Sequence, residues 1–130
     1  MKNILGLLLI IFMLFACEEE AKEYLSISGQ WRCEENTTGL PKVYTIDIEK
    51  STSSDHRYVI YNFNNEGQDE KIYLLLRNDT LFIDTQFIGS GTVSVQGLGF
   101  VSADKKNMRL EYDITKSTGP RSILSTCTHQ

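Results

Sequence analysis

Hydrophobic and polar residues alternate along most of the chain beyond residue 26. The clearest stretch runs from Met108 to Thr115, where Met, Leu, Tyr and Ile alternate with Arg, Glu, Asp and Thr. Successive side chains of a β-strand point to opposite faces, so such a segment turns one face to a core and one to water. The pattern predicts a half-buried strand, and no helical periodicity competes with it beyond residue 23.

The same alternation predicts eight strands, separated by short segments rich in turn residues. They are Ile27–Glu35, Val43–Glu49, Arg57–Phe63, Lys71–Arg77, Thr80–Ile88, Thr92–Ser102, Asn107–Lys116 and Arg121–His129. Asn78–Asp79, between the fourth and fifth strands, has the composition of a two-residue hairpin turn. Connections this short join antiparallel neighbours and exclude parallel crossovers. Eight strands linked in this way form a meander.

A meander of eight strands leaves two unpaired edges unless its first and last strands meet. Unpaired edges promote aggregation, and closure into a barrel removes them. We therefore expect an all-β fold, an eight-stranded antiparallel up-and-down barrel, with an open β-sandwich as the alternative. Gly97 and Gly99 interrupt the sixth strand, where they favour a bend of the kind that a small barrel needs.

The chain begins with a positive charge and a short apolar stretch. Lys2 precedes the run Ile4–Phe15, which as a helix spans roughly 18 Å at about 1.5 Å per residue. A membrane crossing needs about 20 apolar residues, so this run is too short to remain as an anchor. Its charge, length and small residue at the end are typical of a secretory signal peptide, which predicts export.

The residues Leu14-Phe15-Ala16-Cys17 resemble the lipobox of bacterial lipoproteins. In that family the signal peptide is removed just before the cysteine, and the cysteine carries acyl chains such as palmitate. The resemblance implies a removed signal peptide at residues 1–16, lipidation of Cys17 and attachment to a membrane. Two or more acyl chains give stable anchoring, where one chain exchanges. An ordinary signal peptide with an incidental cysteine is the alternative.

Acidic residues follow the cysteine directly. Glu18, Glu19, Glu20 and Glu23 are too densely charged to pack, so residues 17–26 are expected to form a solvated tether. Acids at this place resemble the surface-export signal of lipoproteins in Bacteroidetes-type bacteria. That resemblance implies an outer-membrane lipoprotein on the cell surface, with a periplasm-facing position as the alternative.

Composition narrows the partners of the remaining chain. Removal of residues 1–16 leaves 114 of 130 residues, enough for one domain at 27–130 with a single modest core. The net charge is −4 for the whole chain and becomes −5 without Lys2. A chain of this charge with no basic stripe is repelled by phosphate, which argues against nucleic acid as a partner.

Two cysteines remain besides Cys17. Cys33 lies in the first predicted strand and Cys127 in the last. In a closed barrel these strands are neighbours, and in an exported protein two thiols most often form a disulfide. The alternation allows the bond, and a pairing of Cys33 with Cys127 places Trp31 opposite His129. Two unpaired thiols and a metal pair are the alternatives.

Several short motifs resemble one family. Gly29-Gln30-Trp31 resembles the G-x-W of the first lipocalin strand, and Gly89-Ser90-Gly91-Thr92-Val93 with Leu110-Glu111-Tyr112-Asp113 resembles small lipocalin-like (calycin-type) β-barrel lipoproteins of Bacteroidetes. The resemblance spans most of residues 28–128. It implies a lipocalin-like barrel, a fold that hosts more than one function.

No catalytic or phosphate-binding motif is present in the sequence, so we expect no enzyme, no catalytic residue, no cofactor and no metal site. Aromatic residues are numerous for a small barrel, and Trp31, Tyr44, Phe87 and Tyr112 are candidates for lining a ligand or the core. We therefore expect a membrane-anchored barrel that binds a small apolar or sugar ligand. The alternative is a protein-interaction module or hydrolase inhibitor displayed on the outer membrane.

Overall fold

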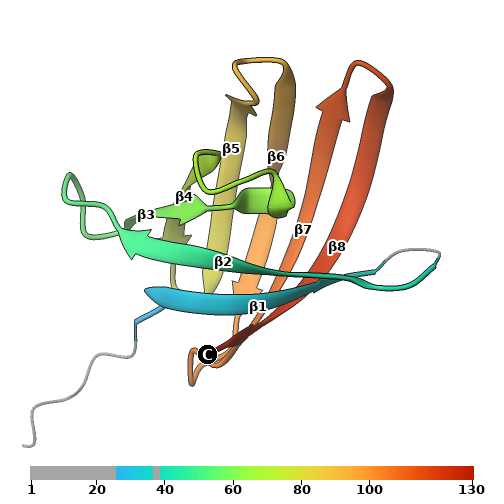
Figure 1. The fold of residues 1–130 in the computed structure, drawn as a ribbon. Coiled ribbons are helices and arrows are strands. Elements are labelled where there is room, and N and C mark those ends of the chain that lie inside the picture. The colour runs from blue at the N-terminus through green and yellow to red at the C-terminus, as the bar shows by residue number, and fades with distance from the viewer. Residues whose placement is uncertain (1–25, 37–38) are drawn as a thin grey trace, which may run out of the picture.

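The computed structural model describes residues 26–36 and 39–130, which form a closed antiparallel β-barrel (Figure 1). Eight strands follow one another around the barrel in sequence order. They are β1 Gly29–Glu35, β2 Lys42–Lys50, β3 Arg57–Tyr61, β4 Lys71–Arg77, β5 Thr80–Ile88, β6 Val93–Val101, β7 Asn107–Lys116 and β8 Gly119–His129. The predicted up-and-down barrel is confirmed, and the open β-sandwich is excluded.

The strand bounds follow the alternation closely, and β4, β5 and β7 have the predicted bounds. The main difference lies after β3, which ends at Tyr61 rather than Phe63. A short 3-10 helix, η2 (Phe63–Asn65), follows. Asn62, Asn64 and Asn65 have positive φ, which asparagine tolerates better than most residues. The chain therefore turns here instead of extending the strand.

β1 and β8 close the barrel, and a disulfide bond joins them. Trp31 lies opposite His129 and Cys33 lies opposite Cys127 in the antiparallel pairing. The Cα atoms of the two bonded cysteines are 4.0 Å apart. The predicted disulfide and its predicted register are both confirmed. Both cysteines point inward and are buried, so the core covers the bond.

Trp31 and His129 pack against each other at one end of the β1–β8 pairing. The Trp31 indole is fully buried, and its Nε1 donates a 2.9 Å hydrogen bond to the Ile27 carbonyl oxygen. The His129 ring stacks on the indole with 4.6 Å between ring centroids. Its two nitrogens lie 3.2 Å from the Lys105 carbonyl oxygen and 3.1 Å from that of Ser28. Both ends of the described chain are thereby held at one end of the barrel.

Inward-facing apolar side chains from all eight strands fill the barrel. On β7, Met108, Leu110, Tyr112 and Ile114 are all buried, as the alternation predicts, and the residues between them are exposed. Burial of apolar surface of this kind is the main favourable contribution to folding. The interior is consequently a packed core and not a wide apolar cup.

The prediction that Phe87 lines the interior is wrong. The pairing of β5 with β6 shifts register between Ile83 and Gln86, which marks a β-bulge. A bulge inserts an extra residue into one strand and changes which side chains face inward beyond it. The inward positions therefore pass from Leu81 and Ile83 to Ile88. Phe87 lies on the outer face, where 66% of its surface is exposed.

All eight strands lie within the predicted domain at 27–130. The predicted signal peptide, Cys17 and the tether up to residue 25 lie outside the described residues. In the part of the chain that is described, no helix has the length and apolar character required to cross a membrane.

Candidate functional site

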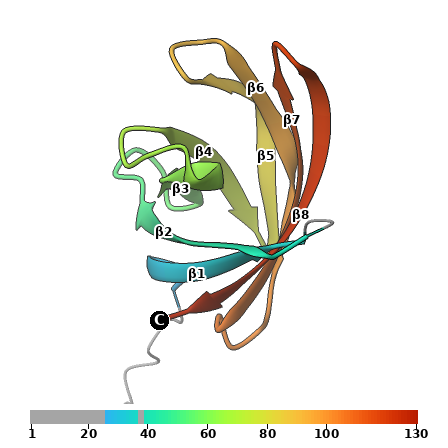
Figure 2. The ribbon, with the colours of Figure 1, turned by 45° about the vertical axis from the view of Figure 1, so that its right-hand side comes forward.

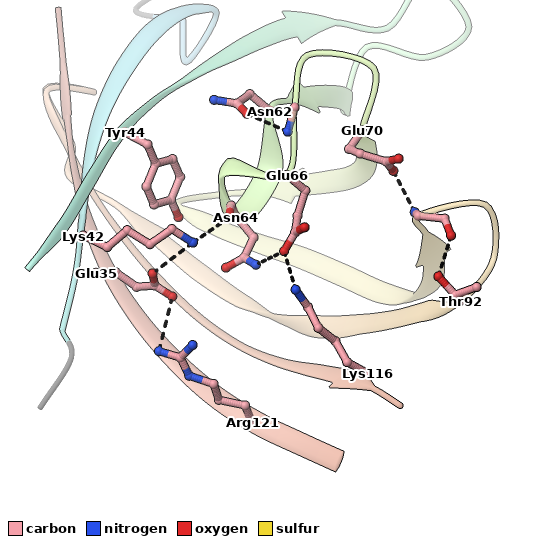
Figure 3. A network of polar contacts seen from close by, with 12 residues as sticks. Glu35, Lys42, Tyr44, Asn62, Asn64, Glu66, Glu70, Thr92, Lys116 and Arg121 are labelled. Carbon is pink, nitrogen blue, oxygen red and sulfur yellow. Dashed lines mark hydrogen bonds and ion pairs between the residues drawn. The ribbon is translucent and has the colours of Figure 1, made fainter. Parts of the chain in front are cut away.

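The two ends of the barrel differ in composition. One end, here called the terminal end, holds Ser26 and Gln130, and Gln130 N donates a 2.9 Å hydrogen bond to the Gln30 carbonyl oxygen. The opposite end, here called the distal end, carries the β1–β2 loop, η2 and the β7–β8 turn. The β5–β6 and β7–β8 hairpins rise at this end, away from the C-terminus (Figure 2). Polar and charged side chains gather here (Figure 3).

A buried glutamate lies within this polar group. Glu35 is the last residue of β1, and its side chain points inward like those of Trp31 and Cys33. Only 1% of the surface of Glu35 is exposed. Neither of its carboxylate oxygens has a hydrogen-bond partner among the described residues. Lys42 Nζ lies 3.5 Å from one oxygen and Arg121 Nη2 lies 4.0 Å from the other. Burial of a carboxylate is costly unless it is both paired and hydrogen-bonded, and Glu35 is only paired.

η2 covers the distal end of the core and is bonded to β7. The Phe63 ring packs against the Tyr112 ring with 4.6 Å between centroids. The Tyr112 hydroxyl donates a 2.9 Å hydrogen bond to Asn64 Oδ1, and Asn64 Nδ2 donates one of 2.8 Å to Glu66 Oε1. Lys116 Nζ donates a 2.7 Å bond to the same Glu66 oxygen. These contacts fix η2 above the interior.

Two residues of β2 join this network from the opposite wall. Lys42 Nζ donates a 2.9 Å hydrogen bond to the Asn64 carbonyl oxygen, so one ammonium group contacts both η2 and Glu35 (Figure 3). The hydroxyl oxygens of Tyr44 and Tyr112 are 3.5 Å apart. The polar network therefore spans the barrel from β1 and β2 to β7.

Burial and hydrogen bonding set the ionisation of this network. Desolvation raises the pKa of Tyr112, and the adjacent Tyr44 raises it further. Desolvation likewise raises the pKa of Tyr44. Desolvation also acts to raise the pKa of Glu66, but hydrogen bonds from Lys116 and Asn64 outweigh it and leave that pKa lowered. At neutral pH both tyrosines are neutral and Glu66 is a carboxylate.

The free energy of unfolding will fall as the pH rises above 10. The folded state holds the protons of Tyr44 and Tyr112, whereas unfolded tyrosine ionises near pH 10. Their contribution is complete below that pH and is lost above it, by roughly 1 kcal/mol for Tyr112 at about pH 11. Urea unfolding at pH 9 and pH 11 measures the loss. Tyr112→Phe should lose less stability over this interval, and an equal loss in both proteins would contradict the prediction.

A cavity of about 170 Å³ lies among these side chains. Its lining comprises Lys42, Asn64, Glu66, Ile114, Lys116, Thr118, Gly119, Arg121 and Ile123. Glu35 contacts two of these residues, Lys42 and Arg121. Three basic side chains thus face two carboxylates, and the site carries a net positive charge in a protein that is acidic overall. No set of three or more metal-ligating side chains occurs among residues 26–36 and 39–130.

The structure brings together only some of the predicted lining residues. Tyr44 and Tyr112 belong to the distal network, whereas Trp31 is a core residue of the terminal end. The sequence did carry a signal for Glu35, because it continues the inward phase two positions after Cys33. Lys42, Lys116 and Arg121 continue the inward alternation of β2, β7 and β8 in the same way, but they are charged residues at or near strand ends. Asn64 and Glu66 lie in or directly after η2, so strand alternation carried no signal for them.

Comparison with solved structures supports the fold. A redesigned β-barrel superposes with a TM-score of 0.54 at 14% sequence identity, over 80% of this chain and 91% of that chain. A likeness at this identity concerns the barrel architecture alone. Comparison with models of known protein families gives no match, and comparison with curated proteins gives none.

Proposed function

We propose that this protein is a lipid-anchored, lipocalin-like lipoprotein of the outer membrane whose barrel binds a small polar ligand at the distal end. The observation that carries the proposal is the buried Glu35 carboxylate, which lacks a hydrogen-bond donor among the described residues. It is paired with Lys42 and Arg121, two residues that line a cavity rich in charged side chains. Buried polar groups are normally hydrogen-bonded, so an exception of this kind requires an explanation. A ligand that donates hydrogen bonds would satisfy Glu35.

The sequence left open whether the ligand is apolar or sugar-like, and the packed interior favours a sugar-like ligand. A wide apolar cup is not available for an apolar ligand, because core side chains occupy the centre of the barrel. The distal cavity is lined largely by charged and polar groups. A sugar-like ligand suits such a lining better than an apolar one, because polar groups discriminate through hydrogen bonds.

The position of the anchor agrees with this proposal. The described chain begins at Ser26, at the terminal end, so a lipid on Cys17 is joined to that end. The distal cavity opens at the opposite end of the barrel. Anchoring through Cys17 would therefore leave the cavity accessible on the side away from the membrane.

Replacing Cys17 with serine should release the protein from membranes. The reason is that Cys17 would carry the acyl chains, and two or more such chains give stable anchoring. Membrane fractionation of cells expressing each form measures the effect. Glu23→Gln is the control, because it changes the same segment without touching the lipidation site or the Cys33–Cys127 disulfide. Unchanged membrane association of Cys17→Ser would refute lipidation, and protease treatment of intact cells tests surface display.

Ligand binding is tested with the lipidated protein purified in detergent. A panel of monosaccharides, small hydroxy acids and fatty acids is screened by thermal shift, alongside native mass spectrometry for co-purified compounds. We expect a polar compound to raise the midpoint temperature, and Glu35→Gln to weaken that effect by about tenfold or more in affinity. Glu34→Gln is the matched control, because Glu34 is adjacent but exposed. Stabilisation by fatty acids alone, or an equal response of Glu35→Gln, would disprove this function.

A second candidate function uses the outer face of the barrel. Phe82 and Leu98 are paired neighbours on β5 and β6, and with Phe100 they are partly exposed, at 37%, 41% and 48%. Adjacent exposed apolar side chains can mark a protein-binding surface. Leu98→Glu would abolish binding of a protein partner and leave small-molecule binding intact. Neither reading assigns catalysis to the protein.

A further inference from the structure

We infer that the outer face of β4–β8 binds a segment of another protein in which apolar side chains lie next to a lysine or arginine. The apolar part of this face, here called the outer patch, comprises Leu75, Phe82, Leu98 and Phe100. The inference rests on the second candidate function and names the class of partner. It is independent of ligand binding at the distal end.

Large apolar side chains at the surface are concentrated on one part of the barrel wall. Seven are exposed among residues 26–36 and 39–130, and five of these lie on β4, β5 and β6: Tyr73, Phe82, Phe87, Leu98 and Phe100. Single exposed apolar residues are normal on soluble proteins and need no explanation. A concentration on three neighbouring strands indicates contact with a partner.

The strand register makes the outer patch continuous. Leu75 lies opposite Phe82, and Phe82 lies opposite Leu98. Side chains that lie directly opposite each other on one face of a sheet are close enough to touch. Phe100 follows two positions after Leu98, so it lies on the same face of β6. The patch therefore crosses three strands without an interruption.

An open groove of about 700 Å³ borders the outer patch. It extends over β5 to β8, strands that lie side by side in the barrel (Figure 1). Leu98 lines the groove and lies opposite Glu111, which lines it too. Pockets of roughly 300–1,000 Å³ hold drug-sized ligands, so this groove has room for a long side chain of a partner that contacts the patch.

The charges of the groove select the partner. Four charged residues line it, namely Asp84, Arg109, Glu111 and Asp113. Arg109 Nη2 lies 2.6 Å from Glu111 Oε1, so these two charges offset each other, and Asp84 and Asp113 leave the groove negative. The Asp84 side chain has no hydrogen bond or ion pair with a described residue. A lysine or arginine in the groove would supply a partner of opposite charge.

These charges argue against two other occupants of the face. A second copy of this acidic chain would bring the same carboxylates together, and like charges repel. Anionic lipid headgroups would be repelled by Asp84 and Asp113 in the same way. A protein segment with both apolar and basic side chains matches the patch and the groove together.

Selection from a random peptide library displayed on phage tests the inference, with the full chain held in phosphatidylcholine nanodiscs. We expect the enriched peptides to combine apolar residues with lysine or arginine. Leu98→Glu should weaken a selected peptide at least about tenfold, because an apolar contact at the centre of the interface is lost. The new carboxylate itself attracts a basic peptide, so a loss identifies the apolar contact. Val43→Glu is the matched control, because Val43 on β2 is 44% exposed against 41% for Leu98.

Asp84→Asn tests the basic part of the partner. It should weaken the same peptide about threefold and reduce the salt dependence of its affinity, as expected for an exposed ion pair. Asp47→Asn is the control, because Asp47 lies on β2 and does not line the groove.

Two groups of results would contradict the inference. Enriched peptides without basic residues, or an unchanged affinity of Asp84→Asn, would overturn the class of partner and leave the outer patch as a binding surface. Equal binding by Leu98→Glu, no enrichment of any peptide, or displacement of the peptide by phosphatidylglycerol vesicles would overturn both this inference and the second candidate function.

Discussion

Replacement of both Cys33 and Cys127 with alanine will lower the free energy of unfolding by about 2–5 kcal/mol, the range for native disulfides in small exported domains. The bond joins the first strand to the last across a sequence separation of 94 residues. For a loop of about 100 residues, the chain-entropy model gives about 4–5 kcal/mol. The loss arises mainly because the unfolded chain is no longer constrained. Urea unfolding monitored by fluorescence of Trp31, the single tryptophan, measures it.

Reduction of the wild-type protein provides the control for this experiment. Protein treated with a thiol reductant keeps both buried side chains but loses the bond, so it should unfold at nearly the same urea concentration as the double-alanine variant. Equal stability of the oxidised protein and the variant would show that strand pairing alone closes the barrel. Peptide mapping without reductant confirms the bond in the starting material.

Gly97→Ala will destabilise the barrel by about 3 kcal/mol or more, at the upper end of the range for overpacked positions. A Cβ atom at this position would lie 2.7 Å from Tyr112 Cα and 2.6 Å from Tyr112 Cβ, and it would also overlap the Glu111 carbonyl oxygen. These atoms belong largely to the backbone of β7, which pairs with β6 here. They cannot move aside as a flexible side chain can, so the two strands must separate.

Gly39→Ala is the matched control for this variant. A Cβ atom at Gly39 meets no other atom within 4 Å, and Gly39 is exposed between β1 and β2. Its replacement should change stability by no more than about 0.5 kcal/mol. Thermal unfolding of both variants measures the difference. A Gly97→Ala protein as stable as Gly39→Ala would show that β6 and β7 do not approach closely at Gly97.

The candidate site was less predictable than the fold. Tyr44 and Tyr112 were expected inside the barrel from alternation, and both are buried. Phe87 was expected with them, but alternation counts residues two at a time and cannot detect a bulge within β5. Glu35 was open to prediction as an inward residue. Its contacts with Lys42 and Arg121 were not, because Arg121 is distant in sequence and reaches Glu35 only through the β1–β8 pairing.

By itself the sequence determined the number and order of the strands, their inward faces outside the β5 bulge and the partner of Cys33. These features follow from the period-two pattern, from short connections and from the chemistry of two cysteines in the first and last strands. Only the tertiary structure decided that η2 covers the distal end, that Lys42, Asn64, Lys116 and Arg121 line one cavity, and that Glu35 is paired with two of these residues. The reason is physical: the alternation specifies which face of a strand is buried, but barrel closure and the turn at η2 decide which buried or rim residues become neighbours.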